Sequence, residues 1–350
     1  MSGDGLDRRS FLKKASALTA ASAAVFSLEE QILQAHQSQQ EPPQGRGFGR
    51  PQQPAAPDVP GPIPTGKLGK LTFTRLIAGH NLVGFQAHSR DLIYTSQLLR
   101  AYFTDDKVLE TYQKYEEHGI NASMLRVEAH SLELAKRYMK ERGGKLQWMA
   151  QLVINERDQT TDLEKAAELG VVAAHVRGLE GDRFFKSERM DVIAKTIENI
   201  KKAGMVAGLG SHSLDPLIAA EQMGLGADYY FKTFNSAQYW SAGPPVPSDP
   251  NWKPSKTQLV QSEYAAATHD NIWETTPKAT SEFFAKIKKP FVAYKVLAAG
   301  AIHPRDGFKY AFEKGADFIC VGMYDFQLKE GTNIAKATLN GKLDRSRDWC

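Results

Sequence analysis

Histidines and a glutamate lie at the ends of several short apolar runs in this chain. His175 ends one run together with Arg177, and His212 follows two glycines at the end of the next run. Imidazole and carboxylate groups bind divalent metals, so we expect a zinc, manganese or iron ion that polarises a substrate or activates water. The four candidate metal ligands, each from a different run, are His80, Glu128, His175 and His212.

Basic side chains within these apolar runs or at their ends indicate a second kind of chemistry. Lys295 interrupts an apolar run, and burial of its ammonium group would suit electrostatic or Schiff-base catalysis. Arginines clamp carboxylate or hydroxyl oxygens through paired hydrogen bonds. We therefore predict that the catalytic residues are His175, Lys295, Arg177 and Arg126. The predicted substrate-binding residues are Asn81, Gln151, Lys232, Asn235 and Asp325.

The elements that position these residues alternate along the chain. Apolar, β-rich runs predict strands at 71–78, 120–127, 146–154, 171–176, 205–209, 227–234, 291–297 and 318–321. Helix-like segments lie between them at 105–117, 131–142, 161–169, 189–203, 215–223, 280–288 and 306–314, and 333–339 follows the last strand. Eight such repeats predict a (β/α)8 TIM barrel, whose active site lies at the carboxyl ends of the strands.

Structural alternatives remain for both the fold and the site. A doubly wound open sheet is the alternative fold, but the turn at 79–81 lacks the glycine pattern typical of such sheets. His175 could pack against the top of the barrel and donate to a backbone carbonyl. Lys295 could form an ion pair with Glu128 or Asp325. Cys320, in an apolar strand, is expected to be a small core residue.

The last repeat contains a turn of small residues at 298–302 and a glycine at 322. Backbone N–H groups in such a turn can approach an anion, and many barrels bind phosphate after strands seven and eight. These turns would therefore hold NADP if the protein were an oxidoreductase. Tight packing beneath the following helix is the alternative explanation for the small residues.

The N-terminal 66 residues precede the predicted barrel. Residues 7–14 read DRRSFLKK and are followed by a mild, alanine-rich apolar run at 15–26. This pattern predicts a twin-arginine signal peptide over 1–36, recognised by the twin-arginine export machinery, and a periplasmic or otherwise exported protein. Residues 37–66 are rich in proline, glutamine and glycine and predict a disordered linker. The barrel then spans 67–342, and a C-terminal tail that we expect to be mobile spans 343–350.

Composition excludes several classes of partner. The chain has 350 residues and a net charge of +4, and its basic residues do not interleave with aromatics, which argues against nucleic acid as a partner. The apolar run at 15–26 is too short for a stable membrane span. Two cysteines cannot form a disulfide framework. A small-molecule substrate is the expected partner, and the sequence fixes no oligomeric state.

Four segments resemble aldo/keto reductases: 74–79 (TRLIAG), 116–121 (EEHGIN), 174–175 (AH) and 208–212 (GLGSH). The resemblance implies a barrel and NADPH-dependent carbonyl reduction. The family places an aspartate and a tyrosine after the second strand and a lysine on the third, where this chain has NASMLR at 121–126 and WMAQ at 148–151. His175 alone matches the catalytic set. The resemblance therefore implies a divergent, exported member that lacks most of that set.

The sequence leaves three functions open. The preferred one is an exported, metal-assisted barrel enzyme that acts on a small polar, carbohydrate-derived substrate by hydrolysis, elimination or isomerisation. An NAD(P)-dependent, aldo/keto reductase-like oxidoreductase is the alternative. A barrel that binds a solute without catalysis is the third.

Overall fold

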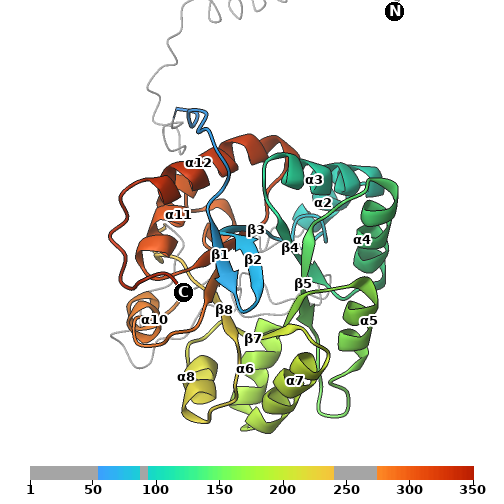
Figure 1. Ribbon diagram of the computed structural model, residues 1–350, viewed down its shortest axis with the longest axis vertical. Helices are drawn as coiled ribbons and strands as arrows, with labels where there is room; N and C mark the ends of the chain where they lie inside the picture. The colour runs from blue at the N-terminus through green and yellow to red at the C-terminus, as the bar shows by residue number, and fades with distance from the viewer. Residues whose placement is uncertain (1–53, 87–93, 240–273) are drawn as a thin grey trace, which may run out of the picture. The chain divides into compact units, whose positions relative to one another are not determined.

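Eight parallel strands close into a barrel in the computed structural model, which describes residues 54–86, 94–239 and 274–350 (Figure 1). Each strand pairs with the next along the chain, and β10 pairs with β3 to close the ring. The TIM barrel prediction is confirmed. The barrel strands are β3 (Leu76–Ala78), β4 (Ala122–Arg126), β5 (Gln147–Leu152), β6 (Ala173–Val176), β7 (Val206–Ser211), β8 (Tyr229–Thr233), β9 (Phe291–Tyr294) and β10 (Phe318–Val321).

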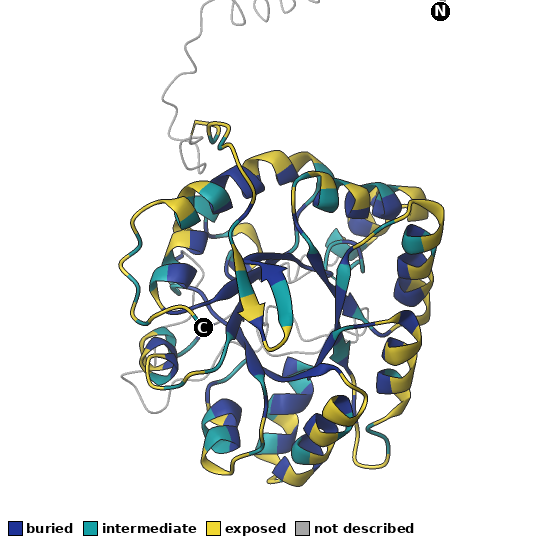
Figure 2. Cartoon of the chain, in the orientation of Figure 1, coloured by how far each residue is buried: buried dark blue, intermediate teal, exposed yellow. Residues whose placement is uncertain are grey.

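Helices surround the barrel and turn their buried faces toward it (Figure 2), and most residues on these faces are apolar. They are α2 (Thr95–Tyr102), α3 (Asp105–Glu117), α4 (Ala129–Glu141), α5 (Thr161–Leu169), α6 (Gly178–Lys186), α7 (Met190–Lys202), α8 (Asp215–Gln222), α10 (Pro277–Phe284), α11 (Pro304–Glu313) and α12 (Leu328–Asn340). Two short 3-10 turns, η1 (Ala298–Gly300) and η2 (Asp325–Gln327), follow β9 and β10.

Local sequence signals explain where these helices begin and end. The Thr104 hydroxyl accepts a hydrogen bond from the Lys107 amide and caps α3. Gly170 ends α5 in a left-handed conformation, which costs glycine little. No helix among residues 54–86, 94–239 and 274–350 is long and apolar enough to cross a membrane.

A hairpin closes the amino end of the barrel. The run predicted as one strand, 71–78, divides at Arg75 into β2 (Leu71–Thr74) and β3. β2 pairs antiparallel with β1 (Thr65–Leu68), which includes the last two residues of the expected linker. Leu68 and Phe73 of the hairpin pack into the same apolar cluster as the residues that fill the barrel. The hairpin therefore fills the amino end of the barrel with apolar side chains. The polar groups lie at the opposite end, where the strands have their carboxyl ends.

The C-terminal residues pack against the barrel, which differs from the mobile tail we expected. Asp317, just before β10, is fully buried. Its carboxylate forms ion pairs with Arg347 at 2.8 Å and with Arg345 at 3.4 Å. The Trp349 ring lies between two guanidinium groups, 3.6 Å from that of Arg75 and 3.3 Å from that of Arg345. A buried carboxylate needs such partners, so the tail is part of the fold.

We predict that Arg347→Met destabilises the protein by about 3–5 kcal/mol, because it leaves the buried Asp317 carboxylate with incomplete compensation. Lys342→Met is the matched control: this exposed lysine lies just before the tail, and its loss should change the free energy of unfolding by less than about 0.5 kcal/mol. Urea unfolding followed by circular dichroism measures both. Equal stability of the two variants would contradict the account of the tail.

Candidate functional site

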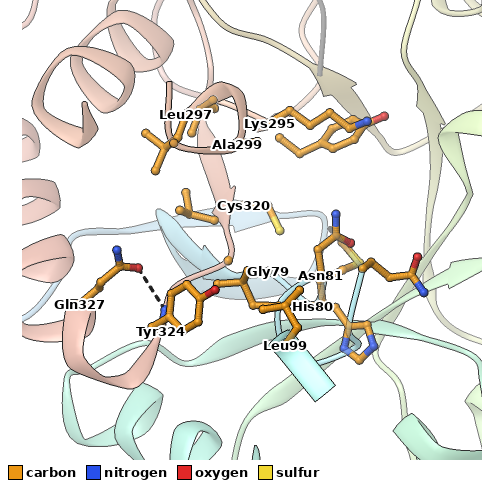
Figure 3. Close-up of a pocket in the computed structure, with 18 of the residues that line it drawn as sticks. Gly79, His80, Asn81, Leu99, Lys295, Leu297, Ala299, Cys320, Tyr324 and Gln327 are labelled. Carbon is orange, nitrogen blue, oxygen red and sulfur yellow. Dashed lines mark hydrogen bonds between the residues drawn. The ribbon is translucent and has the colours of Figure 1, made fainter. Parts of the chain in front are cut away.

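A cavity of about 340 Å³ opens at the carboxyl ends of β3, β9 and β10 (Figure 3). Four of the predicted site residues line it: His80, Asn81, Gln151 and Lys295. Figure 3 shows Lys295 and the loop that follows β9 (the β9 loop) on one side of the cavity, with Asn81 and His80 on the other. The remaining lining is largely apolar, a combination typical of small-molecule sites.

The β9 loop that borders the cavity is held in an unfavourable backbone conformation. Lys295, Ala298 and Ala299 have φ angles of 59°, 46° and 53°, in the left-handed region. Each such residue costs on the order of 1 kcal/mol, so the surroundings must hold the loop in place. One contact that does so is the Asn235 side-chain amide, which donates to the Lys295 carbonyl at 3.2 Å. Asn235 therefore positions the loop and does not line the cavity.

Beside the cavity, His212 and Asp182 form a hydrogen-bonded pair. The Asp182 carboxylate lies 2.7 Å from His212 Nδ1 and also accepts hydrogen bonds from the His212 and Ser213 amides and the Ser213 hydroxyl. His212 is in ring contact with Tyr294, which lines the cavity, at 5.8 Å between centroids. The pair thus lies at the rim, next to the cavity wall.

The electrostatics of this pair favour a neutral imidazole. Burial, followed by the positive charge of Lys295, lowers the pKa of His212 to about 4, although Asp182 acts in the opposite direction. At neutral pH the proton shared with Asp182 is assigned to Nδ1, because the carboxylate only accepts. Nε2 then carries a lone pair and makes no hydrogen bond to any residue in the described part of the chain. A neutral imidazole oriented by a carboxylate is the arrangement of a general base.

Asp182 was not among the residues predicted from the sequence, because helix α6 was not predicted. Gly178 and Gly181 lower the helix propensity of this segment. The structure explains the second glycine: a Cβ on Gly181 would overlap the carbonyl oxygen of Gly210 in β7. Close packing of α6 on β7 therefore brings Asp182 within hydrogen-bond distance of His212. Gly181, opposite Gly210 of β7, is the sequence signal that could have indicated this packing.

The two predicted arginines are bound to carboxylates at the same rim. Arg177 forms a two-point ion pair with Glu180, with both N···O distances at 2.7 Å. Arg126 contacts Glu128 at 2.8 Å, and burial lowers the pKa of Arg126. Each arginine thus carries a compensated charge and presents N–H groups near the mouth of the barrel.

The four predicted metal ligands do not come together, and this corrects the predicted metal site. His80 lies 3.0 Å from the Ser131 hydroxyl, and Glu128 binds Arg126. His175 Nδ1 lies 3.0 Å from the Tyr229 hydroxyl, beneath the cavity, and the ring stacks on Phe231. Among the described residues no group of three or more histidine, cysteine, aspartate or glutamate side chains is placed to hold a metal ion. We derive no step through a metal.

Two predicted substrate-binding residues point away from the cavity. Lys232 alternates with Phe231, which lines the cavity, and so faces the helical layer, where it pairs with Glu274 at 2.5 Å. Both side chains are at most 1% exposed. Asp325 binds the Tyr102 hydroxyl at 2.5 Å, Lys114 at 3.2 Å and Lys107 at 3.3 Å. Burial opposes its ionisation, but these hydrogen bonds hold the pKa of Asp325 at about 2.

Known structures resemble this fold at low sequence identity. A putative aldo-keto reductase from Pseudomonas aeruginosa is 17% identical, with 79% of this chain and 94% of that chain covered and a TM-score of 0.51. Aldo-keto reductase AKR11C1 from Bacillus halodurans, in its holo form, is 10% identical over 80% and 92% of the two chains, also with a TM-score of 0.51. The fold is that of a divergent, aldo/keto reductase-like barrel.

No protein-family model matches the chain, and neither does any curated protein. In this aldo/keto reductase-like barrel, β4 and β5 present Met124 and Gln151 to the cavity. Neither a thioether nor an amide is an acid or a base near neutral pH. At the described rim, His212 and Asp182 form a hydrogen-bonded pair of titratable groups.

We predict that acidification destabilises this barrel through its buried histidines. Burial lowers the pKa of His80 and of His175 to about 3, whereas the pKa in the unfolded chain is near 6.5. The unfolded state therefore binds more protons between these values, so stability is complete above about pH 6.5 and falls as the pH drops toward 3. The loss between pH 7 and pH 5 should be about 2 kcal/mol for each histidine.

Urea unfolding at the two pH values measures this loss. His175→Phe keeps the ring stack on Phe231 but removes one titrating group. It should reduce the loss by about 2 kcal/mol, whatever its stability at pH 7. A pH dependence identical to that of the unmodified protein would show that His175 does not titrate as the buried geometry requires.

Proposed function

We propose that this chain is an acid–base enzyme that moves a proton on a small polar, carbohydrate-derived substrate, in an isomerisation or an elimination. The observation that carries the proposal is the His212–Asp182 pair at the rim, whose Nε2 makes no hydrogen bond within the described residues. The lowered pKa of His212 favours the neutral imidazole that a base requires. Metal assistance is not part of the proposal, since the described candidate ligands are bound to other partners.

The surroundings of the pair suit a substrate that carries a carbonyl and hydroxyl groups. Lys295 lines the cavity and lies close enough to His212 to influence its charge. In this proposal its ammonium group stabilises an oxyanion that develops next to the carbon losing a proton. The amides of Asn81 and Gln151 also line the cavity and can bind hydroxyl groups in either direction.

The proposed step is a balanced proton transfer. His212 Nε2 takes the proton from the carbon beside the carbonyl, the electron pair moves onto the carbonyl oxygen, and Asp182 stabilises the imidazolium. In an isomerisation the adjacent hydroxyl passes its proton to this oxyanion, the second carbonyl forms, and the same imidazolium returns its proton to the first carbonyl carbon. In an elimination it protonates the departing hydroxyl, and water leaves. Neither route needs an oxidant or a reductant.

We predict that the protein catalyses exchange of such a C–H proton with D2O. A panel of aldoses, ketoses, 3-keto sugars and uronic acids, incubated with enzyme in D2O, would be read by NMR for deuterium incorporation. His212→Asn should lower the rate by about 10²–10⁴-fold, because an amide cannot act as the base. Asp182→Asn should lower the exchange rate by a similar factor, because an amide in place of the carboxylate favours the wrong tautomer of His212.

His130→Asn is the matched control, since His130 is an exposed histidine paired with Asp105 on the outer helices. Its exchange rate should equal that of the unmodified protein. Exchange that continues undiminished in His212→Asn would rule out the assigned base. A folded, unmodified protein that exchanges no member of the panel would count against the reaction class.

A nicotinamide-dependent oxidoreductase is the second candidate function. The cavity lies between the carboxyl ends of β9 and β10, and the left-handed turn of Ala298, Ala299 and Gly300 brings backbone close to it. That turn and Gly322 would hold the cofactor, which would supply hydride. NADPH titration by fluorescence separates the candidates: a micromolar dissociation constant with NADPH-dependent reduction favours the oxidoreductase.

We also propose that the protein acts outside the cytoplasm. The support is the paired Arg8 and Arg9 with the apolar run that follows, a segment outside the described residues. Replacing both arginines by lysine should abolish export of the full chain through the twin-arginine route, because that route reads the pair. Fractionation measures this, and unchanged export of the variant would contradict the proposed route.

A further inference from the structure

A ladder of aromatic rings leads from the cavity to the protein surface. Phe103 is buried, Tyr324 lines the cavity, and Phe326 is 68% exposed, the largest exposure among the large hydrophobic side chains described. The rings stack in near-parallel pairs: Phe103 on Tyr324 at 5.4 Å and 19°, and Tyr324 on Phe326 at 5.1 Å and 18°. One face of Phe326 is therefore covered by Tyr324.

The exposed ring is held by fixed neighbours. Tyr102 packs edge-on against Phe326, with the ring planes at 89°. Its hydroxyl binds Asp325, which two lysines also hold, and the Gln327 side chain accepts a hydrogen bond from the Tyr324 amide. An exposed phenylalanine held this firmly is preorganised, so a ligand that stacks on it loses little entropy in ordering the site.

From this arrangement we infer that the outer face of Phe326 is a stacking platform for a second saccharide ring, so that the substrate is an oligosaccharide or glycoside. This inference deepens the proposed function and rests on it for the position of the reacting ring. Tyr324 and Gln327, on either side of the platform ring in sequence, both line the cavity. The platform therefore lies next to residues that line the cavity.

The charges beside the platform favour a saccharide over a nucleotide. Lys107 and Lys114 are both paired with Glu110 and Asp325, at distances from 2.7 to 3.3 Å. Two positive and two negative charges cancel, which leaves no net field for a polyanion. A pyranose ring presents an apolar C–H face to the aromatic ring, and its hydroxyl groups can bind the surrounding polar side chains.

The test measures binding, independently of catalysis, on full-length protein carrying His212→Asn to prevent turnover. The probes are gluco- and xylo-oligosaccharides of one to four rings, titrated by ligand-observed NMR, with AMP and NADPH as comparison ligands. We expect affinity to rise roughly tenfold from one ring to the longer members, the size of one aromatic contact. Adding Phe326→Ala should abolish this rise without weakening the one-ring probe.

Two further substitutions show whether the ring itself is responsible. Phe326→Trp should keep the rise, and Phe326→Leu should lose it, because leucine is apolar but cannot stack. Leu98→Ala is the control, since Leu98 is also an exposed hydrophobic residue, at 60%, and should leave the rise unchanged.

Affinity that does not depend on ring number, or a rise that survives Phe326→Ala or Phe326→Leu, would overturn the platform. Tighter binding of AMP or NADPH that Phe326→Ala removes, without any saccharide effect, would overturn it in favour of a nucleotide. A rise that depends on Phe326 in a protein that shows no proton exchange would uphold the platform and reject only the proposed reaction.

Discussion

Closure of the barrel between its first and last strands is the constraint on which the cavity depends. The Gly79 amide donates to the Val321 carbonyl at 2.8 Å, and a Cβ on Gly79 would lie 2.5 Å from the Gly322 nitrogen. Only glycine permits this approach. Because the two chain segments meet here, residues that follow β3 and residues that follow β10 line one cavity. The aromatic ladder extends outward from the same junction.

A second close approach, between α6 and β7, creates the acid–base pair. Gly181 lets the helix lie against Gly210, and the next residue, Asp182, then lies within hydrogen-bond distance of His212. Burial and Lys295 keep the imidazole neutral, while Asp182 fixes which nitrogen is free. The same rim holds Arg126 and Arg177 in ion pairs. Packing thus favours the neutral imidazole that the proposed proton transfer requires.

The architecture was largely predictable because strand periodicity and helix stops are local signals. The strand at 318–321 and the helices at 105–117 and 161–169 have the predicted bounds. The site was less predictable, since it depends on side-chain direction and partners. Lys232 faces outward because Phe231 faces inward, and the predicted metal ligands are held by Ser131, Arg126, Tyr229 and Asp182. Asp182 lies in helix α6, which was not predicted because its glycines lower the helix propensity of the segment.

The protonation state of His212 decides whether this side chain can act as a base at neutral pH. Two-dimensional ¹H–¹⁵N NMR of histidine-labelled protein reports both the tautomer and the titration of each imidazole. We expect that at pH 7 His212 is neutral with its proton on Nδ1, and that its pKa is about 4. Asp182→Asn should alter that spectrum. A proton on Nε2 at pH 7, or a pKa above 6.5, would contradict the assignment of His212 as the base.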